Sequence, residues 1–240
     1  MMMLNTITVI FEIFFILYYF LALISLPKLP NFRSNLKQSW KAAFENRTFA
    51  LQFVAALVVF LIFPFKADDY FQWIQLREGV QWNDPLLNLL PALNVSYPIF
   101  GIIYLSVIYL LYRLLHDPKR FLWFAWAFNM ETGFRFLTIY FVALNPPTGL
   151  VDLHDPLAEI FIYGENMAIT KDLFFSGHTA TMVFVCFFLP TARERRIAIG
   201  LSLVLVTLLL IQHVHYSLDI AAAPLFTLAA IWIIKKVGII

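Results

Sequence analysis

The chain has 240 residues, of which 61% are hydrophobic and 13% are charged, and its formal net charge is +2. An ordinary globular domain carries about 25% charged residues, and a soluble domain of this length has too little interior to bury so much apolar surface. The hydrophobic content also excludes a disordered chain, and the small net charge argues against nucleic-acid binding. The single cysteine, Cys186, excludes an intrachain disulfide and a cysteine-based zinc cluster. The composition therefore predicts an integral membrane protein.

Seven apolar stretches are long enough, or nearly so, to cross a hydrocarbon core, which requires roughly 20 residues per helix. They cover residues 6–26, 49–65, 97–115, 121–144, 174–190, 197–214 and 218–234. None shows the alternation of a transmembrane β-strand, so the expected fold is all-α, a polytopic transmembrane helix bundle. The first stretch lacks the basic start and the cleavage site of a secretory signal, so it is either an additional span or an anchor. We expect residues 1–48 to form this helix with a basic connector, and residues 49–240 to form a six-helix domain.

The basic residues predict how the helices are oriented. Of the seventeen lysines and arginines, thirteen fall in connectors on one face and three on the other, and the face alternates at every crossing. Since lysine and arginine are enriched in cytoplasmic loops, connectors 66–96, 145–173 and 215–217 should be extracytoplasmic and the C-terminus cytoplasmic. Acidic and histidine residues gather in or next to two of these outer connectors: Asp152, His154, Asp155, Glu159, Glu165, Asp172, His178, His213, His215 and Asp219.

The first candidate site is the segment Phe175-Ser176-Gly177-His178-Thr179 near the start of the fifth stretch. A helix N-terminus offers unpaired N–H groups and the positive end of the helix dipole to an anion. Ser176 can cap the helix, Gly177 allows a ligand to approach the backbone, and His178 lies in the first turn. The alternative is a simple serine cap followed by a histidine that faces the lipid headgroups.

The second candidate site is His215-Tyr216-Ser217-Leu218-Asp219. If this segment is helical, the i,i+4 spacing places the imidazole and the carboxylate on one face. A carboxylate that accepts a hydrogen bond from Nδ1 leaves Nε2 available as a nucleophile or base. A purely structural histidine–aspartate pair is the alternative. His213, two residues earlier, should point away from this face and lie at the level of the headgroups.

The third candidate is Arg135, which lies inside an apolar stretch. An arginine at this depth costs several kcal/mol unless it is paired or lies in a water-filled cavity. Glu131, at position i−4, is one possible partner, and a phosphate clamped in bidentate fashion is the other. The sequence Asn145-Pro146-Pro147 should end the helix about two and a half turns beyond Arg135.

One arginine, two histidines and one aspartate from three helices suit phosphoryl transfer. One imidazole can attack phosphorus, the second can protonate the departing oxygen, and the guanidinium can stabilise the charge of the transition state. We expect no cofactor and no metal. A metal site built from both histidines and the aspartate is the less favoured alternative, because a zinc ion bound there would remove the nucleophile and the acid.

These residues resemble the sphingomyelin synthase family within the type-2 phosphatidic acid phosphatase superfamily. The resemblance covers about residues 49–234 and rests on Phe-Ser-Gly-His-Thr from Phe175, His-Tyr-Ser-Leu-Asp from His215, Asp172 four residues before Ser176, Arg135-x-x-Thr138 and Leu144-Asn145-Pro146-Pro147. Asp68-Asp69 only weakly resembles the Pro-Leu-Pro-Asp motif of the family.

Some positions depart from the family pattern. Thr170 and Lys171 stand where the synthases tend to have cysteine and glycine, and Asn145 replaces part of a Leu-Pro ending. The Lys-x6-Arg-Pro motif of the phosphatases is absent, and Leu208 and Leu209 replace their Ser-Arg. The missing phosphatase motifs favour the synthase branch.

The resemblance implies an enzyme that moves a phospho-headgroup from a phospholipid donor to the hydroxyl of a ceramide-like or diacylglycerol acceptor, both drawn from the bilayer. It implies that His215 attacks phosphorus with Asp219 as its orienting partner, and that His178 protonates the leaving group and then deprotonates the acceptor. The implied phosphate-binding residues are Arg135, Ser176, Gly177 and Asp172. Two alternatives stay open: a lipid phosphate phosphatase with the same site residues, and a non-catalytic membrane protein.

Overall fold

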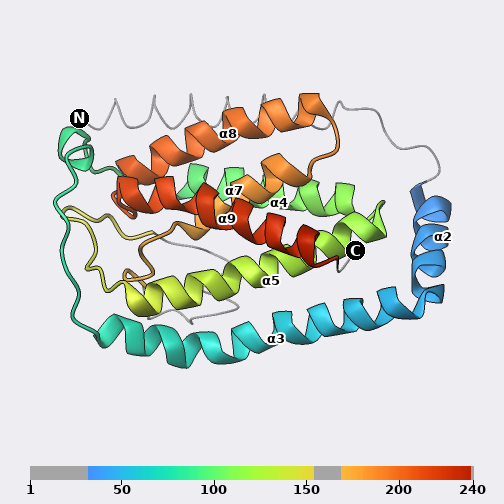
Figure 1. Cartoon of the computed structure of the whole chain (residues 1–240). Coiled ribbons are helices and arrows are strands. Elements are labelled where there is room, and N and C mark those ends of the chain that lie inside the picture. The colour runs from blue at the N-terminus through green and yellow to red at the C-terminus, as the bar shows by residue number, and fades with distance from the viewer. Residues whose placement is uncertain (1–31, 154–168, 239–240) are drawn as a thin grey trace.

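The structure is a computed structural model that describes residues 32–153 and 169–238 (Figure 1). The apolar stretch 6–26 and the residues His154, Asp155, Glu159 and Glu165 lie outside the described residues. The described ranges are helical and contain no named strand, which confirms the predicted all-α bundle. The helices are α2 (Phe32–Glu45), α3 (Arg47–Leu76), α4 (Ser96–Leu114), α5 (Pro118–Phe141), α7 (Gly177–Phe188), α8 (Ala192–Ile211) and α9 (Ser217–Val237), with a short 3-10 helix, η1 (Leu87–Leu89).

Six of the predicted stretches correspond to α3, α4, α5, α7, α8 and α9. Three differences matter for the site. α3 extends beyond its predicted end as far as Leu76, α5 ends at Phe141 before the predicted stop, and α7 begins only at Gly177. At α5 and α7 the apolar run continues outside the helix, whereas α3 continues through the mainly polar segment 66–69 beyond its apolar run. In both cases hydrophobicity alone does not mark the last hydrogen-bonded turn of a helix.

Three helical segments in the described ranges are long and apolar enough to cross a membrane: Arg47–Ala67, Ser96–Leu114 and Ser217–Val237. α7 is a shorter apolar helix, α5 is interrupted by Glu131 and Arg135, and α8 begins with a charged turn. α3 exposes a broad apolar surface formed by Leu51, Val54, Leu57, Val58, Leu61, Ile62 and Phe65. Such a continuous apolar face is stable only when lipid or another protein covers it, as expected for a membrane protein.

Small residues allow the central helices to approach closely. In α9, Ala223, Thr227 and Ala230 are fully buried at i, i+4 and i+7. Small residues at this spacing form the interfaces of membrane helices, where close backbone approach replaces the hydrophobic driving force that operates in water. α9 thereby packs against both α5 and α7, and these are the three helices that carry or adjoin the candidate site residues.

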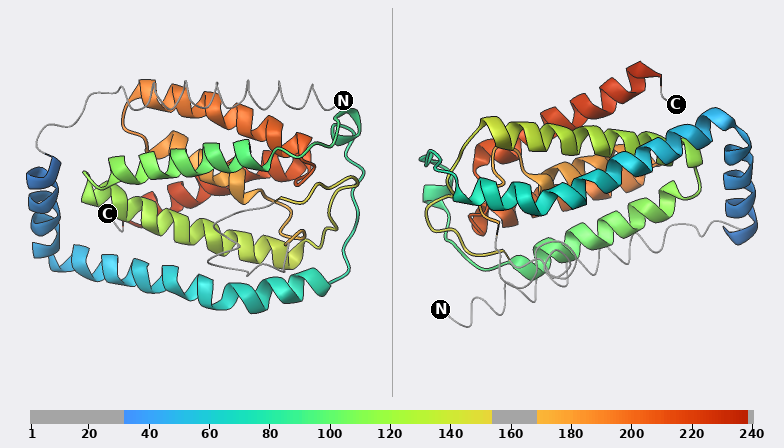
Figure 2. Two further views of the ribbon diagram at one scale, coloured as in Figure 1. Left: turned by 180° about the vertical axis from the view of Figure 1, so that it is seen from behind. Right: turned by 90° about the horizontal axis from the view of Figure 1, so that it is seen from below.

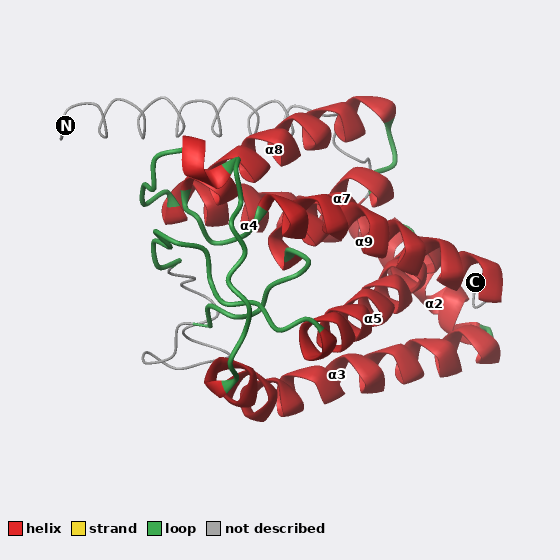
Figure 3. Cartoon of the chain, turned by 60° about the vertical axis from the view of Figure 1, so that its left-hand side comes forward, coloured by secondary structure: helices red, strands yellow, loops and turns green. Residues whose placement is uncertain are grey.

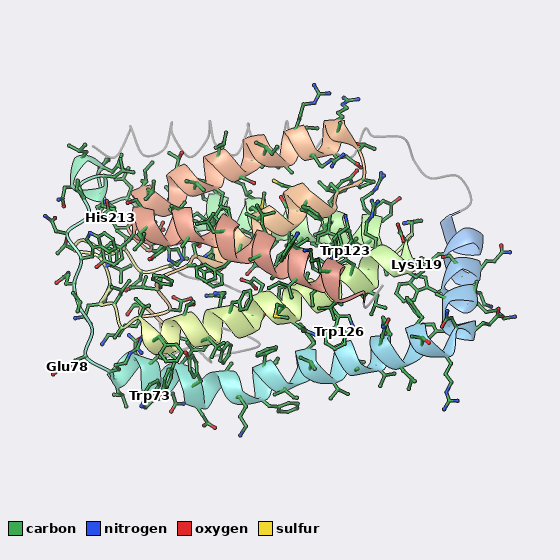
Figure 4. The ribbon with its side chains drawn as sticks, viewed as in Figure 1. Trp73, Glu78, Lys119, Trp123, Trp126 and His213 are labelled. Atoms are coloured by element: carbon green, nitrogen blue, oxygen red, sulfur yellow. The ribbon has the colours of Figure 1, made fainter. Side chains whose placement is uncertain are left out.

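The connectors separate into two groups at opposite ends of the bundle (Figures 1 and 2). Connectors 77–95, 142–153 and 169–176 and the turn 212–216 meet at one end, which we call the loop end (Figure 3). The short links 115–117 and 189–191, the helix α2 and the end of α9 lie at the other. Figure 4 shows His213 and Glu78 at the loop end and Lys119 at the opposite end. This grouping agrees with the charge pattern, while the side of the membrane that each end faces stays a prediction.

Helix α2 was not expected, because the segment before residue 49 was predicted as a connector. Its Trp40 ring packs edge-on against Phe53 and Phe121, with centroids 5.7 and 5.4 Å apart, and its Nε1 donates to the Leu115 carbonyl at 2.7 Å. Asn46 then caps α3. α2 is too polar to span a membrane, so its helical structure depends on these contacts with distant segments.

Candidate active site at the loop end

Ser176 is the N-cap of α7, as the sequence predicts. Its Oγ accepts a hydrogen bond from the Thr179 amide at 3.3 Å, and its own amide donates to the Asp219 carbonyl at 3.0 Å. Ser176 is fully buried. The start of α7 is therefore tied directly to the start of α9, and His178 in the first turn of α7 is brought close to the residues around Asp219.

His215 and Asp219 form the predicted pair, but in a different way from a shared helix face. α9 begins at Ser217, so His215 precedes the helix and its Nδ1 lies 3.3 Å from Asp219 Oδ2 across the helix N-terminus. The same carboxylate accepts hydrogen bonds from the amides of Tyr216 and Phe174, each at 3.0 Å. Asp219 is fully buried, and these donors fix its orientation relative to the imidazole.

The two candidate histidines are in contact. His178 Nδ1 lies 3.4 Å from His215 Nε2, and the rings meet edge to face with centroids 5.6 Å apart. Since Nδ1 of His215 donates to Asp219, its Nε2 carries the lone pair, and His178 Nδ1 is then the donor between the two rings. The lone pair that would act as a nucleophile thus already faces a nitrogen that can supply a proton.

Arg135 forms a salt bridge with Asp172, with 3.1 Å between its terminal nitrogen and Oδ2. The expectation that Glu131 could be its partner is corrected: one carboxyl oxygen of Glu131 is buried without a hydrogen-bond partner. The Nε of Arg135 is also buried without a partner, and its guanidinium lies 5.9 Å from the centre of the Phe175 ring. Burial raises the pKa of Asp172, and the neighbouring guanidinium opposes this shift.

Gly177 provides the space for this guanidinium. A Cβ atom at Gly177 would overlap with a terminal nitrogen of Arg135 and would lie 2.6 Å from Cζ. The cation on α5 is therefore in close contact with the first residue of α7, immediately before His178. The predicted residues of the three separate elements are brought together at this point: Arg135, Asp172, Ser176, Gly177, His178, His215 and Asp219.

The turn that carries His215 is held by the other connectors of the loop end. Gln212 is fully buried and donates to the Ser96 hydroxyl at 2.9 Å and the Asp152 carbonyl at 3.0 Å. His213 has a left-handed backbone, with φ of 55°, and its Nδ1 lies 3.1 Å from the Thr148 carbonyl oxygen. Only 6% of His213 is exposed, so its side chain is covered by the connectors of the loop end, while its expected position at headgroup level stays a prediction.

Sequence reasoning did not identify Gln212 as part of the support for the site. The polar amide of Gln212 directly after the long apolar run of α8 indicates such a supporting residue, because a buried amide needs hydrogen-bond partners. Within residues 32–153 and 169–238, no group of three or more histidine, cysteine, aspartate or glutamate side chains is arranged to hold a metal ion.

Comparison with known proteins gives one match. Residues 171–236 match the family described as PAP2 superfamily C-terminal, whereas no curated protein and no solved structure matches the chain. The matched residues include α7, α8 and all of α9 except its last residue, with His178, His215 and Asp219, and they exclude Arg135 on α5. This match supports a relation to the type-2 phosphatidic acid phosphatase superfamily and, with it, phosphatase-type or phosphotransferase-type chemistry on lipids.

Proposed function

We propose that this protein is a membrane lipid phosphotransferase that moves a phospho-headgroup from a phospholipid donor to a lipid hydroxyl. The observation that supports this proposal most directly is the 3.4 Å approach of His178 Nδ1 to His215 Nε2, beside a guanidinium packed on Gly177. A nucleophile, a proton donor and a fixed cation within one small region are the groups that phosphoryl transfer requires.

In the first half of the proposed reaction, His215 Nε2 forms a bond to phosphorus while the bond from phosphorus to the diacylglycerol oxygen breaks. His178, in its imidazolium form, gives one proton to that oxygen as it leaves and becomes a neutral imidazole. Asp219 stabilises the positive charge that develops on His215, because its carboxylate accepts the Nδ1 proton in a hydrogen bond. The product of this half is a phosphohistidine that carries the headgroup.

In the second half, the acceptor lipid replaces diacylglycerol. His178, now without its proton, accepts the proton of the acceptor hydroxyl, whose oxygen attacks phosphorus and breaks the bond to His215 Nε2. Arg135 and the positive end of the α7 dipole bind the phosphate oxygens in both halves. Asp172 acts through its salt bridge by orienting Arg135, since a carboxylate would repel a phosphate.

A product analysis tests this proposal against its alternatives. The purified full-length chain is incubated with labelled ceramide, labelled diacylglycerol, several phospholipids and phosphatidic acid. We expect a new lipid that carries the donor headgroup. Release of inorganic phosphate from phosphatidic acid without such a lipid would instead identify a lipid phosphate phosphatase. Neither product from folded protein would overturn the enzymatic proposal and favour a non-catalytic membrane protein.

Replacing Gly177 with alanine should lower kcat on the order of 10²-fold, because the new Cβ would displace the guanidinium of Arg135 by a distance that matters for catalysis. The folded state should change little, since the displaced group is the end of a flexible side chain. Gly101→Ala in α4 is the matched control, because its Cβ would meet no atom within 4 Å. Equal kcat values for the two variants would contradict the proposed place of Arg135.

We also propose that the loop end faces away from the cytoplasm and that the chain is a multi-pass membrane protein. In a Cys186→Ser background, Glu78→Cys should react with a membrane-impermeant maleimide in intact cells, whereas Lys119→Cys should react only after permeabilisation. Both side chains are exposed and lie at opposite ends of the bundle (Figure 4). The reverse labelling pattern would contradict the orientation predicted from the basic residues.

A further inference from the structure

Asp84 lies in the connector between α3 and α4, yet it is hydrogen-bonded to the first residue of α9. Its Oδ2 accepts from the Ser217 amide at 2.6 Å, and its Oδ1 accepts from the Leu86 amide at 3.0 Å. Asp84 is 5% exposed. A buried carboxylate thus pairs with a helix terminus that is 133 residues away in the sequence.

The first N–H groups of a helix have no partner within the helix. At the start of α9, two carboxylates supply the missing acceptors: Asp219 accepts from the Tyr216 amide, and Asp84 accepts from the next amide, that of Ser217. Two negative groups at this position also interact favourably with the helix dipole. His215 is the residue immediately before these two amides, so both carboxylates fix the backbone from which its imidazole projects.

The side chain of Tyr216 is held by the same connector. Its hydroxyl accepts from the Trp82 amide at 3.3 Å and donates to the Asn145 carbonyl at 2.8 Å, and the residue is 1% exposed. Trp82 and Asp84 therefore form hydrogen bonds with the two consecutive residues that follow His215. This arrangement leaves the backbone at His215 little freedom to rotate.

The ionisation of Asp84 fits this arrangement. Burial would raise its pKa, but the hydrogen bonds from Ser217 and from the amides of Leu86 and Leu87 outweigh burial and leave the pKa below its ordinary value. The carboxylate is therefore ionised at neutral pH and accepts hydrogen bonds on both oxygens.

We propose that Asp84 is a positioning residue for the transfer reaction: by anchoring the N-terminus of α9, it holds His215 in register with Asp219 and His178. This inference rests on the proposed function. Asp84 binds the amide of Ser217, which is two residues after His215, so it acts through the backbone and not by touching the phosphate.

The test compares Asp84→Ala and Asp84→Asn with Asn83→Ala in the full-length chain. Asn83 lies next to Asp84 and accepts a hydrogen bond from the exposed Asn88 side chain in the same connector. We expect Asp84→Ala to lower kcat on the order of 10²-fold with KM nearly unchanged, because the nucleophile is displaced and the phosphate contacts remain. Asp84→Asn keeps one carbonyl acceptor and should restore part of that loss, and Asn83→Ala should match the wild type.

Hydrogen–deuterium exchange gives a readout that is independent of turnover. In Asp84→Ala, a peptide that covers residues 215–220 should exchange faster than in the wild type, while peptides from α4 should be unchanged. Unchanged exchange at residues 215–220, or faster exchange with full kcat, would overturn the positioning role. A wild-type chain that transfers no headgroup would overturn the proposed function and, with it, any role of Asp84 in transfer. The exchange rates at residues 215–220 would still show whether Asp84 anchors the N-terminus of α9.

Discussion

Replacing His215 with alanine should lower kcat for headgroup transfer on the order of 10⁴-fold or more, because no covalent intermediate can then form. His215 Nε2 is directed at His178, and its Nδ1 is held by the buried Asp219, so its imidazole is the one oriented for attack. The measurement is the rate of product lipid formation by purified protein at saturating donor and acceptor. Trapping during turnover with a donor labelled at phosphorus should give an acid-labile label on His215.

His116→Ala is a matched control for this variant. His116 lies next to α5 at the end of the bundle opposite the candidate site, where its Nδ1 is 2.9 Å from the Tyr112 carbonyl oxygen. Both variants should elute from size exclusion in detergent like the wild type, and only His215→Ala should lose turnover. Residual transfer within tenfold of the wild type, or a phosphoryl label on another residue, would remove His215 as the nucleophile.

The bundle could be predicted from the sequence because hydrophobicity acts over whole helices. Uninterrupted apolar runs indicated where α3, α4 and α9 lie, and these are the segments long and apolar enough to span a membrane. α2 could not be predicted in this way. Its position depends on Trp40, whose partners Phe53 and Phe121 belong to two other helices, and a single-sequence pattern does not contain such pairings.

The local parts of the site were predictable from residue spacing, and the partner of Arg135 was not. The cap at Ser176 and the approach of His215 to Asp219 each involve residues within four positions of one another. The partner of Arg135 is different. Glu131 is nearer in sequence, but the fold of the connector before α7 brings Asp172 to the guanidinium instead. Because Arg135 and Asp172 are 37 residues apart in the sequence, helical periodicity cannot predict that they pair.

Two of the positions that depart from the family pattern, Thr170 and Lys171, have a structural explanation. Thr170 accepts a hydrogen bond from the Gln75 side chain at 2.7 Å, and Lys171 donates to the Arg77 carbonyl. Both residues thus tie the segment before Asp172 to the end of α3. The side chains that replace cysteine and glycine here hold the connector that presents the partner of Arg135, so these departures are compatible with the proposed chemistry.

Arg135→Lys should lower kcat/KM on the order of 10²-fold to 10³-fold, the size of effect seen when one donor to a developing anion is removed. Lysine keeps the positive charge but is a compact point charge, so it cannot hold two phosphate oxygens in the planar fork of a guanidinium. The lysine side chain is also shorter, so its ammonium would not reach the position beside Gly177 that the guanidinium occupies. We therefore expect KM for the phospholipid donor to rise and kcat to fall together, in steady-state kinetics with the donor concentration varied.

Arg113→Lys separates this effect from the general cost of altering a buried ion pair. Arg113 forms a salt bridge of 2.9 Å with the buried Glu194. This pair has the same chemistry as the pair of Arg135 with Asp172, but it lies far from the loop end. We expect Arg113→Lys to lower thermal stability while kcat/KM stays at the wild-type value. If both variants lost activity equally, Arg135 would be a structural ion-pair partner, and the phosphate would have to be bound by the N-terminus of α7 and the histidines alone.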